Sequence, residues 1–126
     1  MGAGWPAAEA GLSVLIALCR LDELAEGCAR GLDPQQRGKD SLFVLRSAGE
    51  IRLYRNSCPH LDVPLEYRKD RFLSADGSRV ICYAHGAQFL PDTGLCVHGP
   101  CLGERLTALP WVEREGWLMV DEVDLP

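Results

Sequence analysis

Two short motifs combine cysteine with histidine at spacings that suit metal binding. Cys58 and His60 form a Cys-x-His motif, and Cys82 and His85 form a Cys-x-x-His motif. In a [2Fe–2S] cluster with mixed ligands, two thiolates bind one iron and two imidazoles bind the other, so each motif must supply one ligand of each kind. The spacing therefore predicts one cluster per chain, with the two cysteines on one iron and the two histidines on the other.

Zinc is the main alternative occupant, because it takes the same thiolate and imidazole ligands. Zinc motifs usually pair like with like, as Cys-x₂₋₄-Cys followed by His-x₃₋₅-His. A one-residue gap between Cys58 and His60 fits two irons better. A zinc-binding or metal-free interaction module stays open as a rival hypothesis.

Both motifs must be held by tight loops, and their neighbours have the composition of turns. Asn56, Ser57 and Pro59 surround the first cysteine, and Gly86 follows the second histidine. Asn, Ser and Pro favour turns, and glycine allows backbone conformations that other residues avoid. Backbone N–H groups can then approach the bridging sulfides of a cluster.

The rest of the chain has the pattern of an antiparallel β protein. Apolar runs separated by Gly-, Asn- or Asp-containing turns predict hairpins. The predicted strand pairs are 42–45 with 51–54, 72–73 with 80–81, 88–90 with 95–97, and 111–114 with 117–120, and the first strand is expected at 12–18. One short helix is indicated over residues 21–29, with Asp22 as its N-cap and Gly27 limiting its length.

Length and charge restrict the organisation and the partners. With 126 residues, the chain is expected to form one domain over residues 12–126, after a flexible tail at 1–11. A net charge of −5 gives no basic footprint for nucleic acid, and the run 68–71 is interpreted as solvated. The apolar segment 12–18 is too short to cross a membrane and lacks the flanks of a leader, so a cytoplasmic protein is expected.

The two motifs resemble the cluster-binding loops of the Rieske iron–sulfur family. Cys58-Pro59-His60-Leu61 is similar to the first loop and Cys82-Tyr83-Ala84-His85-Gly86 to the second, and the likeness runs from about Leu18 to Val123. The resemblance implies an all-β fold, with an antiparallel sandwich or partly open barrel. It also implies a small cluster-binding subdomain at about 56–89 and a covering loop at about 98–102.

Departures from the high-potential members of the family bear on the reduction potential. Those members carry a disulfide between the two loops, where this chain has Val63 and Ala84. They also place serine and tyrosine hydroxyls against the cluster sulfurs, where this chain has Ala87 and Phe89. Because hydrogen bonds to sulfur stabilise the reduced cluster, we expect a potential at the low end of the Rieske range.

The resemblance implies a one-electron carrier, similar to the soluble ferredoxins that serve oxygenases. Electrons are expected to leave through the imidazole edges of His60 and His85, beside an apolar rim of Leu61, Pro100 and Leu102. Its partners would be a reductase donor and an oxygenase or reductase acceptor. A small subunit of a larger reductase, such as a nitrite reductase, is the alternative.

A stand-alone oxidoreductase is not expected. Oxygenases with a Rieske domain need a further iron, typically bound by two histidines and a carboxylate. His98 is the one histidine left once the predicted cluster is built. Cys96 and Cys101 flank this residue beside the covering loop. A local disulfide and a pair of free thiols are both open, and thiols are expected in a reducing compartment.

The segment 66–78 lengthens the connection between the two motifs. We expect it to form a surface excursion that influences the choice of partner.

Overall fold

The computed structural model describes residues 14–126, so the predicted tail at 1–11 lies outside the described residues. Within 14–126 the chain forms nine strands and two short 3-10 helices, and it has no α-helix. No helix of this part is long and apolar enough to cross a bilayer. The elements are β1 (Leu15–Arg20), η1 (Leu21–Glu23), β2 (Ala29–Leu32), β3 (Leu42–Ser47), β4 (Glu50–Arg55), β5 (Val80–Ile81), β6 (Gln88–Phe89), β7 (Cys96–His98), β8 (Val112–Arg114), β9 (Trp117–Asp121) and η2 (Glu122–Asp124).

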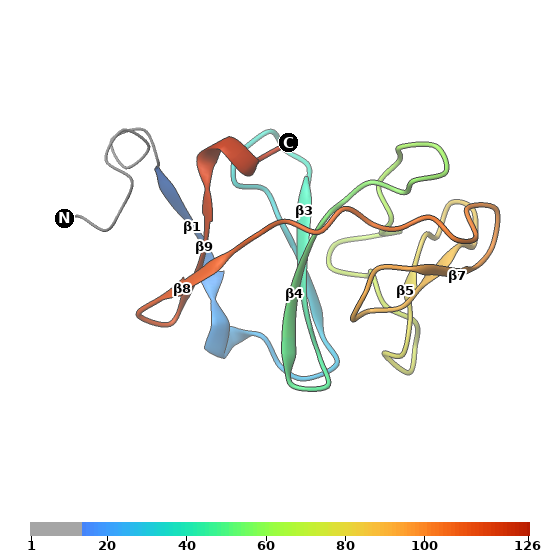
Figure 1. Ribbon diagram of the computed structural model, residues 1–126, viewed down its shortest axis with the longest axis horizontal. Coiled ribbons are helices and arrows are strands. Elements are labelled where there is room, and N and C mark those ends of the chain that lie inside the picture. The colour runs from blue at the N-terminus through green and yellow to red at the C-terminus, as the bar shows by residue number, and fades with distance from the viewer. Residues whose placement is uncertain (1–13) are drawn as a thin grey trace.

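The strands form three antiparallel sheets of three strands each. Their orders are β1-β9-β8, β2-β3-β4 and β5-β6-β7. In Figure 1 these sheets follow one another from left to right, and the segment after β7 crosses back to reach β8. The predicted all-β fold is confirmed, and in the described part the sheets do not close into a barrel.

The central sheet is covered on both faces, which explains the unbroken apolar run in β3. Phe43 and Leu45 belong to one buried core, shared with the residues of the metal-binding motifs. Leu42 and Val44 face the opposite way, into a second core with strands β1 and β9. Successive side chains of a strand point to opposite faces, so burial of both faces requires apolar residues at every position.

Three of the four predicted strand pairs form hairpins, whereas 72–73 forms no strand and contacts β5 only through an isolated bridge between Leu73 and Val80. Two of the hairpins have glycine at a two-residue turn. β3 pairs with β4 around Ala48 and Gly49, and β8 pairs with β9 around Glu115 and Gly116. All four turn residues have positive φ, between 52° and 86°. Two consecutive residues with positive φ match the right-handed twist of the flanking strands.

The helix predicted for residues 21–29 is wrong. Only a 3-10 turn forms at η1, Arg20 and not Asp22 takes the N-cap position, and Ala29 already begins β2. The guanidinium of Arg46 donates to two carbonyls of this segment at 2.7 and 2.9 Å. Because a tertiary contact satisfies these carbonyls, the segment does not need helical hydrogen bonds.

The loop after β7 approaches β6 so closely that only glycine fits at one position. Gly99 has φ +110°, and a Cβ added there would lie 2.7 Å from the Cα of Ala87. Gly103, in the same loop, has φ +89° but open space around its missing Cβ. A side chain at Gly99 would therefore meet both steric overlap and backbone strain, whereas one at Gly103 would meet backbone strain alone.

We expect Gly99→Ala to lower the free energy of unfolding by about 3 kcal/mol, because overlap adds to strain. Gly103→Ala should cost only about 1 kcal/mol, from strain alone. Urea unfolding followed by tryptophan fluorescence measures both. Equal losses in the two variants would show that the approach of the loop to Ala87 is not tight.

Candidate metal centre

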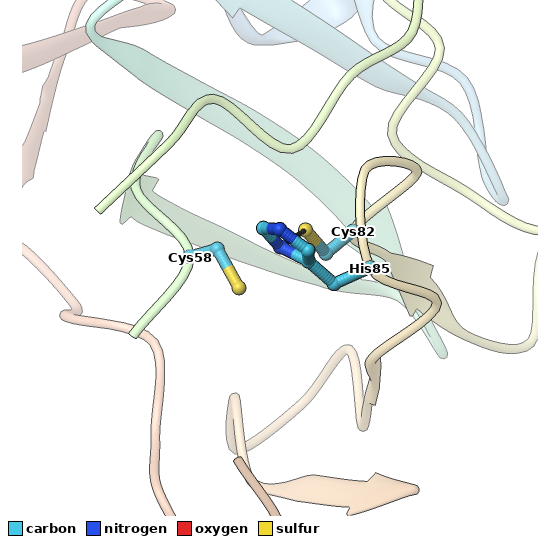
Figure 2. A group of neighbouring side chains, drawn as sticks. All are labelled: Cys58, Cys82 and His85. Carbon is cyan, nitrogen blue, oxygen red and sulfur yellow. Dashed lines mark hydrogen bonds between the residues drawn. The ribbon is translucent and has the colours of Figure 1, made fainter. Parts of the chain in front are cut away.

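Three ligand atoms converge between the loop after β4 and the loop after β5. The Sγ atoms of Cys58 and Cys82 and a ring nitrogen of His85 all lie within 4.8 Å of one another. Figure 2 shows the side chains reaching from the two loops into the same space. The structure thus brings together residues from motifs more than twenty positions apart in the chain.

The first loop is a tight turn closed by its own backbone. The amide of Asp62 donates to the carbonyl of Cys58 at 2.7 Å, and the amide of Cys58 donates to the carbonyl of Val63 at 2.8 Å. Asp62 has φ +54°, a conformation that short polar residues tolerate. The hydroxyl of Ser57 donates to the carboxylate of Asp62 and links the two sides of the turn.

The second loop uses glycine to reverse the chain. The amide of Gly86 donates to the carbonyl of Cys82 at 2.7 Å, and Gly86 has φ +77°. The amide of Cys82 donates to the carbonyl of Ala87 at 2.9 Å. This reversal places the side chains of Cys82 and His85 on the same side, with Sγ 3.9 Å from Nδ1.

His60, the fourth predicted ligand, is outside this group of three converging atoms and lies beside His85. The two imidazole rings lie 5.0 Å apart, centre to centre, with an interplanar angle of 90°. His60 is exposed and His85 is half-buried, whereas Cys58 and Cys82 are fully buried. The exposure of the four side chains therefore differs by type: the two thiols are buried, and the two imidazoles reach the surface.

The electrostatics of the site disfavour a bare thiolate at Cys82. Burial raises the pKa of the Cys82 thiol, and the neighbouring Cys58 thiol raises it further. Two adjacent thiolates repel each other in a buried site unless positive charge lies between them. A set of two thiols and two imidazoles suits both iron–sulfur clusters and zinc, and the residues present fit the group that the motifs predict.

Asn56 ties the two loops together through its side-chain amide. Its Nδ2 donates to the carbonyl of Asp40 and to the carboxylate of Glu66, each at 2.9 Å, and its Oδ1 accepts from the amide of Leu65 at 2.9 Å. The carbonyl of Leu65 in turn accepts from the amide of Tyr83, in the second loop, at 3.0 Å. The segment at 65–66 is thus held between both loops.

Sequence reasoning treated Asn56 only as a turn former and missed this role. The signal was weak because its partners are 9, 10 and 16 positions away. Asn56 exposes only 8% of its surface, and it is the one buried polar or charged residue within 14–126.

We expect Asn56→Ala to lower the free energy of unfolding by about 2 to 3 kcal/mol, because partners of a buried amide lose their hydrogen bonds. Asp33→Ala is the control, since it removes two bonds of an exposed carboxylate to the amides of Arg37 and Gly38. That variant should lose about 1 kcal/mol. Chemical unfolding checks both, and a smaller loss at Asn56 than at Asp33 would refute its positioning role.

Cys96 and Cys101 lie behind the first loop as free thiols. Their Sγ atoms are 3.2 Å apart, with Cys101 donating to Cys96, and the thiol of Cys96 donates to the carbonyl of His98 at 3.3 Å. Burial first, then the Cys96 contact and the charge of Cys58, raise the pKa of Cys101 to about 12. The thiol of Cys101 is therefore protonated at neutral pH.

Comparison with known families decides between the occupants. The sequence model of the Rieske [2Fe-2S] domain matches residues 15–113. The chain belongs to the Rieske family. Rieske domains hold a [2Fe–2S] cluster, so this is the cofactor of the chain and not zinc.

Solved structures with the same fold include other Rieske proteins. The ferredoxin of Sphingomonas yanoikuyae B1 aligns with a TM-score of 0.66 and 23% identity, over 86% of this chain and 99% of that one. The ferredoxin of carbazole 1,9a-dioxygenase from Nocardioides aromaticivorans IC177 aligns with a TM-score of 0.64 and 22% identity, over 86% and 97%. No curated protein sequence matches this chain.

Exposed apolar side chains are present both in the first loop and in the loop after β7. Leu61, next to His60 in the chain, is 57% exposed, and Leu102, in the loop after β7, is 68% exposed. Pro100 of the same loop is also exposed, as is His98 at the end of β7. Exposed apolar side chains of this kind suit brief contact with another protein.

Proposed function

We propose that this Rieske protein is a one-electron carrier whose cluster is bound by Cys58, Cys82, His60 and His85. The observation that carries the proposal is the sorting of these residues into a buried thiol pair and an imidazole pair at the surface. When bound, the [2Fe–2S] cluster supplies a site that accepts and releases one electron.

The protein's own residues define the route and exclude water. The exposed ring of His60 and the half-buried ring of His85 offer the shortest path from the site to a partner. The buried core around Cys58 and Cys82 keeps solvent from the opposite side. We propose that the rim of Leu61, Pro100 and Leu102 gives a small docking patch suited to a transient complex.

We propose an oxygenase as the electron acceptor and a reductase as the donor. Support comes from the fold, which this chain shares with a ferredoxin of carbazole 1,9a-dioxygenase and with a ferredoxin described in complex with its oxygenase. A cytoplasmic location is part of the proposal, supported by free thiols at the exposed Cys28 and at the adjacent Cys96 and Cys101. The Rieske domain is proposed to span 12–126, with its cluster-binding part at about 56–89 and the covering loop at about 98–102.

Electron paramagnetic resonance of the reduced protein tests the ligand assignment. The wild type should contain about two irons and two sulfides per chain and give a rhombic signal with low average g. His85→Ala should abolish this signal, while His98→Ala, at the remaining histidine of the chain, should keep it. A signal that survives in His85→Ala would refute the ligand set, and zinc without sulfide would refute the carrier function.

The potential should lie at the low end of the Rieske range, at about −150 mV to zero. Ala87 and Phe89 are fully buried in the core around the thiols, and neither side chain can donate a hydrogen bond. Ala87→Ser adds one donor and should raise the potential by roughly 40 mV, the equivalent of about 1 kcal/mol.

Ala84→Ser is the matched control, because Ala84 lies in the same loop but is exposed. Its potential should equal that of the wild type in a spectroelectrochemical titration. A potential well above zero in the wild type, or equal shifts in the two serine variants, would contradict this account of the missing donors.

A further inference from the structure

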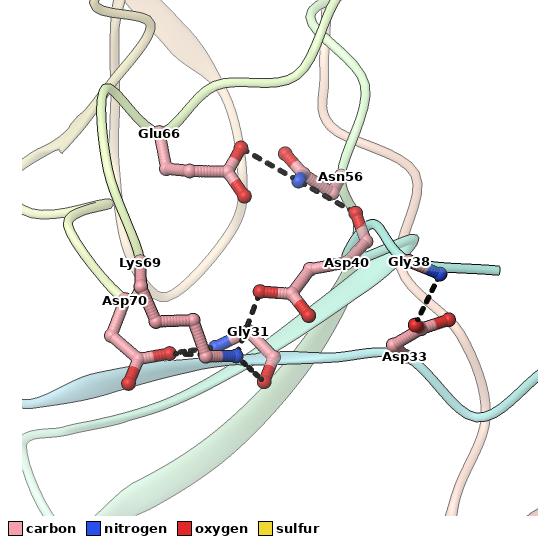
Figure 3. Close-up of polar contacts among 8 residues, drawn as sticks. All are labelled: Gly31, Asp33, Gly38, Asp40, Asn56, Glu66, Lys69 and Asp70. Atoms are coloured by element: carbon pink, nitrogen blue, oxygen red, sulfur yellow. Dashed lines mark hydrogen bonds and ion pairs between the residues drawn. The ribbon is translucent and has the colours of Figure 1, made fainter. Parts of the chain in front are cut away.

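The excursion at 66–78 has two sets of charged side chains: one set contacts the rest of the protein, and the other forms an exposed face. Three of its residues, Glu66, Lys69 and Asp70, point toward the central sheet in Figure 3. Asp70 accepts from the amide of Gly31 at 2.7 Å, and Lys69 donates to Asp40 at 2.8 Å. The carboxylates of Glu66 and Asp70 are therefore held against the body of the protein, and that of Asp70 lies beside the ammonium group of Lys69.

The close packing of Asp40 depends on glycine at position 31. A Cβ on Gly31 would overlap the Asp40 carboxylate. Lys69 also donates to the carbonyl of Gly31 at 3.1 Å and lies 3.4 Å from the Asp70 carboxylate. Three hydrogen bonds thus fix the excursion to β2 and to the loop that follows it.

Two arginines and two tyrosines of this region form an exposed face. The rings of Tyr67 and Tyr83 lie 4.6 Å apart, and the guanidinium carbon of Arg68 lies 5.3 Å from the centre of the Tyr67 ring. Tyr67 is 55% and Tyr83 38% exposed. We call Tyr67, Arg68, Arg71 and Tyr83 the tyrosine–arginine face.

The arginines of this face carry charge that no partner neutralises within residues 14–126. Neither Arg68 nor Arg71 forms an ion pair there. Burial raises the pKa of the Tyr83 hydroxyl, and the positive charge of Arg71 offsets part of this increase. The hydroxyl of Tyr83 donates to the carbonyl of Leu73 at 2.6 Å, which fixes the ring in place.

The face lies at one end of an open groove of about 1040 Å³. The groove also contains Glu26, the paired Lys69 and Asp70, and Asp76. Glu26 accepts from two backbone amides of the β3–β4 turn, and Asp76 accepts from Ser74 and Ser78. The groove as a whole is balanced in charge, and its unpaired positive charge is concentrated beside the second cluster loop.

We propose that the tyrosine–arginine face binds a carboxylate-bearing surface of the redox partner, next to the exit route through His85. The proposal rests on the proposed electron-carrier function. Arginine offers a planar set of donors that matches carboxylates, and tyrosine and arginine are enriched among residues that dominate binding. Since the chain has a net charge of −5, an acidic partner is repelled at long range, and the arginines of this face supply a local attraction at short range.

The first test is electron transfer from the reduced holoprotein to small oxidants of opposite charge, measured by stopped flow. The oxidants are ferricyanide, which is anionic, and tris(phenanthroline)cobalt(III), which is cationic. We expect the double variant Arg68→Gln/Arg71→Gln to slow the reaction with ferricyanide by about fivefold at low salt and to accelerate the reaction with the cobalt complex. Salt at 0.5 M should remove most of both effects.

The matched control is Arg20→Gln/Arg114→Gln, which changes the net charge equally on the sheet β1-β9-β8, outside the groove. It should change either rate by less than about 1.5-fold, because these charges are screened and lie on a different sheet from the face. Equal slowing in the two double variants would overturn the proposal, since only net charge would then matter. Failure of the wild type to reduce either oxidant would instead refute the electron-carrier function itself.

The second test is binding of a fluorescently labelled octaglutamate peptide, followed by anisotropy. The wild-type holoprotein and the control double variant should bind it at low salt, and the Arg68→Gln/Arg71→Gln variant should not. Inorganic phosphate, added at a concentration that supplies as much negative charge as the peptide, should compete only weakly. Strong competition by phosphate would show that the face is a small-anion site and not a protein-docking face. Binding of the peptide to the Arg68→Gln/Arg71→Gln variant would also overturn the proposal.

Discussion

Two buried thiols lie side by side in this Rieske domain, and much of the surrounding structure serves that arrangement. Such a pair is stable as thiolates only when positive charge lies between them, which is why burial and the neighbouring thiol raise the pKa of Cys82. The tight turn at Asp62 and the reversal at Gly86 bring the two cysteines together without strain on their own backbones. The imidazoles are left outside, where an electron can leave.

Hydrogen bonds connect the two cluster-binding loops through the segment at 65–66. Asn56 binds the segment at 65–66, and the carbonyl of Leu65 binds the second loop through Tyr83. The same segment begins the excursion that Lys69 and Asp70 fix to the central sheet. Cluster binding, loop spacing and the shape of the surface beside His85 therefore depend on one connected set of contacts.

The central sheet provides the rigid support for these loops. Both faces of β3 are buried, so one core holds the metal-binding loops and the other holds the outer sheet of β1, β8 and β9. Tyr54 contributes to the first core and donates its hydroxyl to the carbonyl of Pro91 at 2.8 Å, which anchors the turn between β6 and β7. Changes in the loops are thus resisted by packing that extends through the whole domain.

Local patterns sufficed to predict the elements that depend on neighbours in the chain. The hairpins at 42–55 and 111–121 follow from apolar runs and turn residues a few positions apart. The resemblance to the Rieske family followed from two motifs in which the cysteine and the histidine are only two or three positions apart, and the family match confirms it. The helix at 21–29 failed because Arg46, more than 20 positions away, satisfies the carbonyls of that segment.

The sequence by itself determined the chemistry of this protein, because the identity and order of two cysteines and two histidines restrict the metal group that they can bind. Only the tertiary structure decided how those residues are positioned and what lies beside them. From the sequence, Asn56 is expected only to form a turn, whereas in the fold its side chain binds residues 40, 65 and 66. Likewise, the sequence suggests only solvated charge at 68–71, whereas in the fold Lys69 and Asp70 bind Asp40 and Gly31 and the two arginines form no ion pair within residues 14–126. The direction in which a side chain points is set by contacts across the fold, and these are absent from any local pattern.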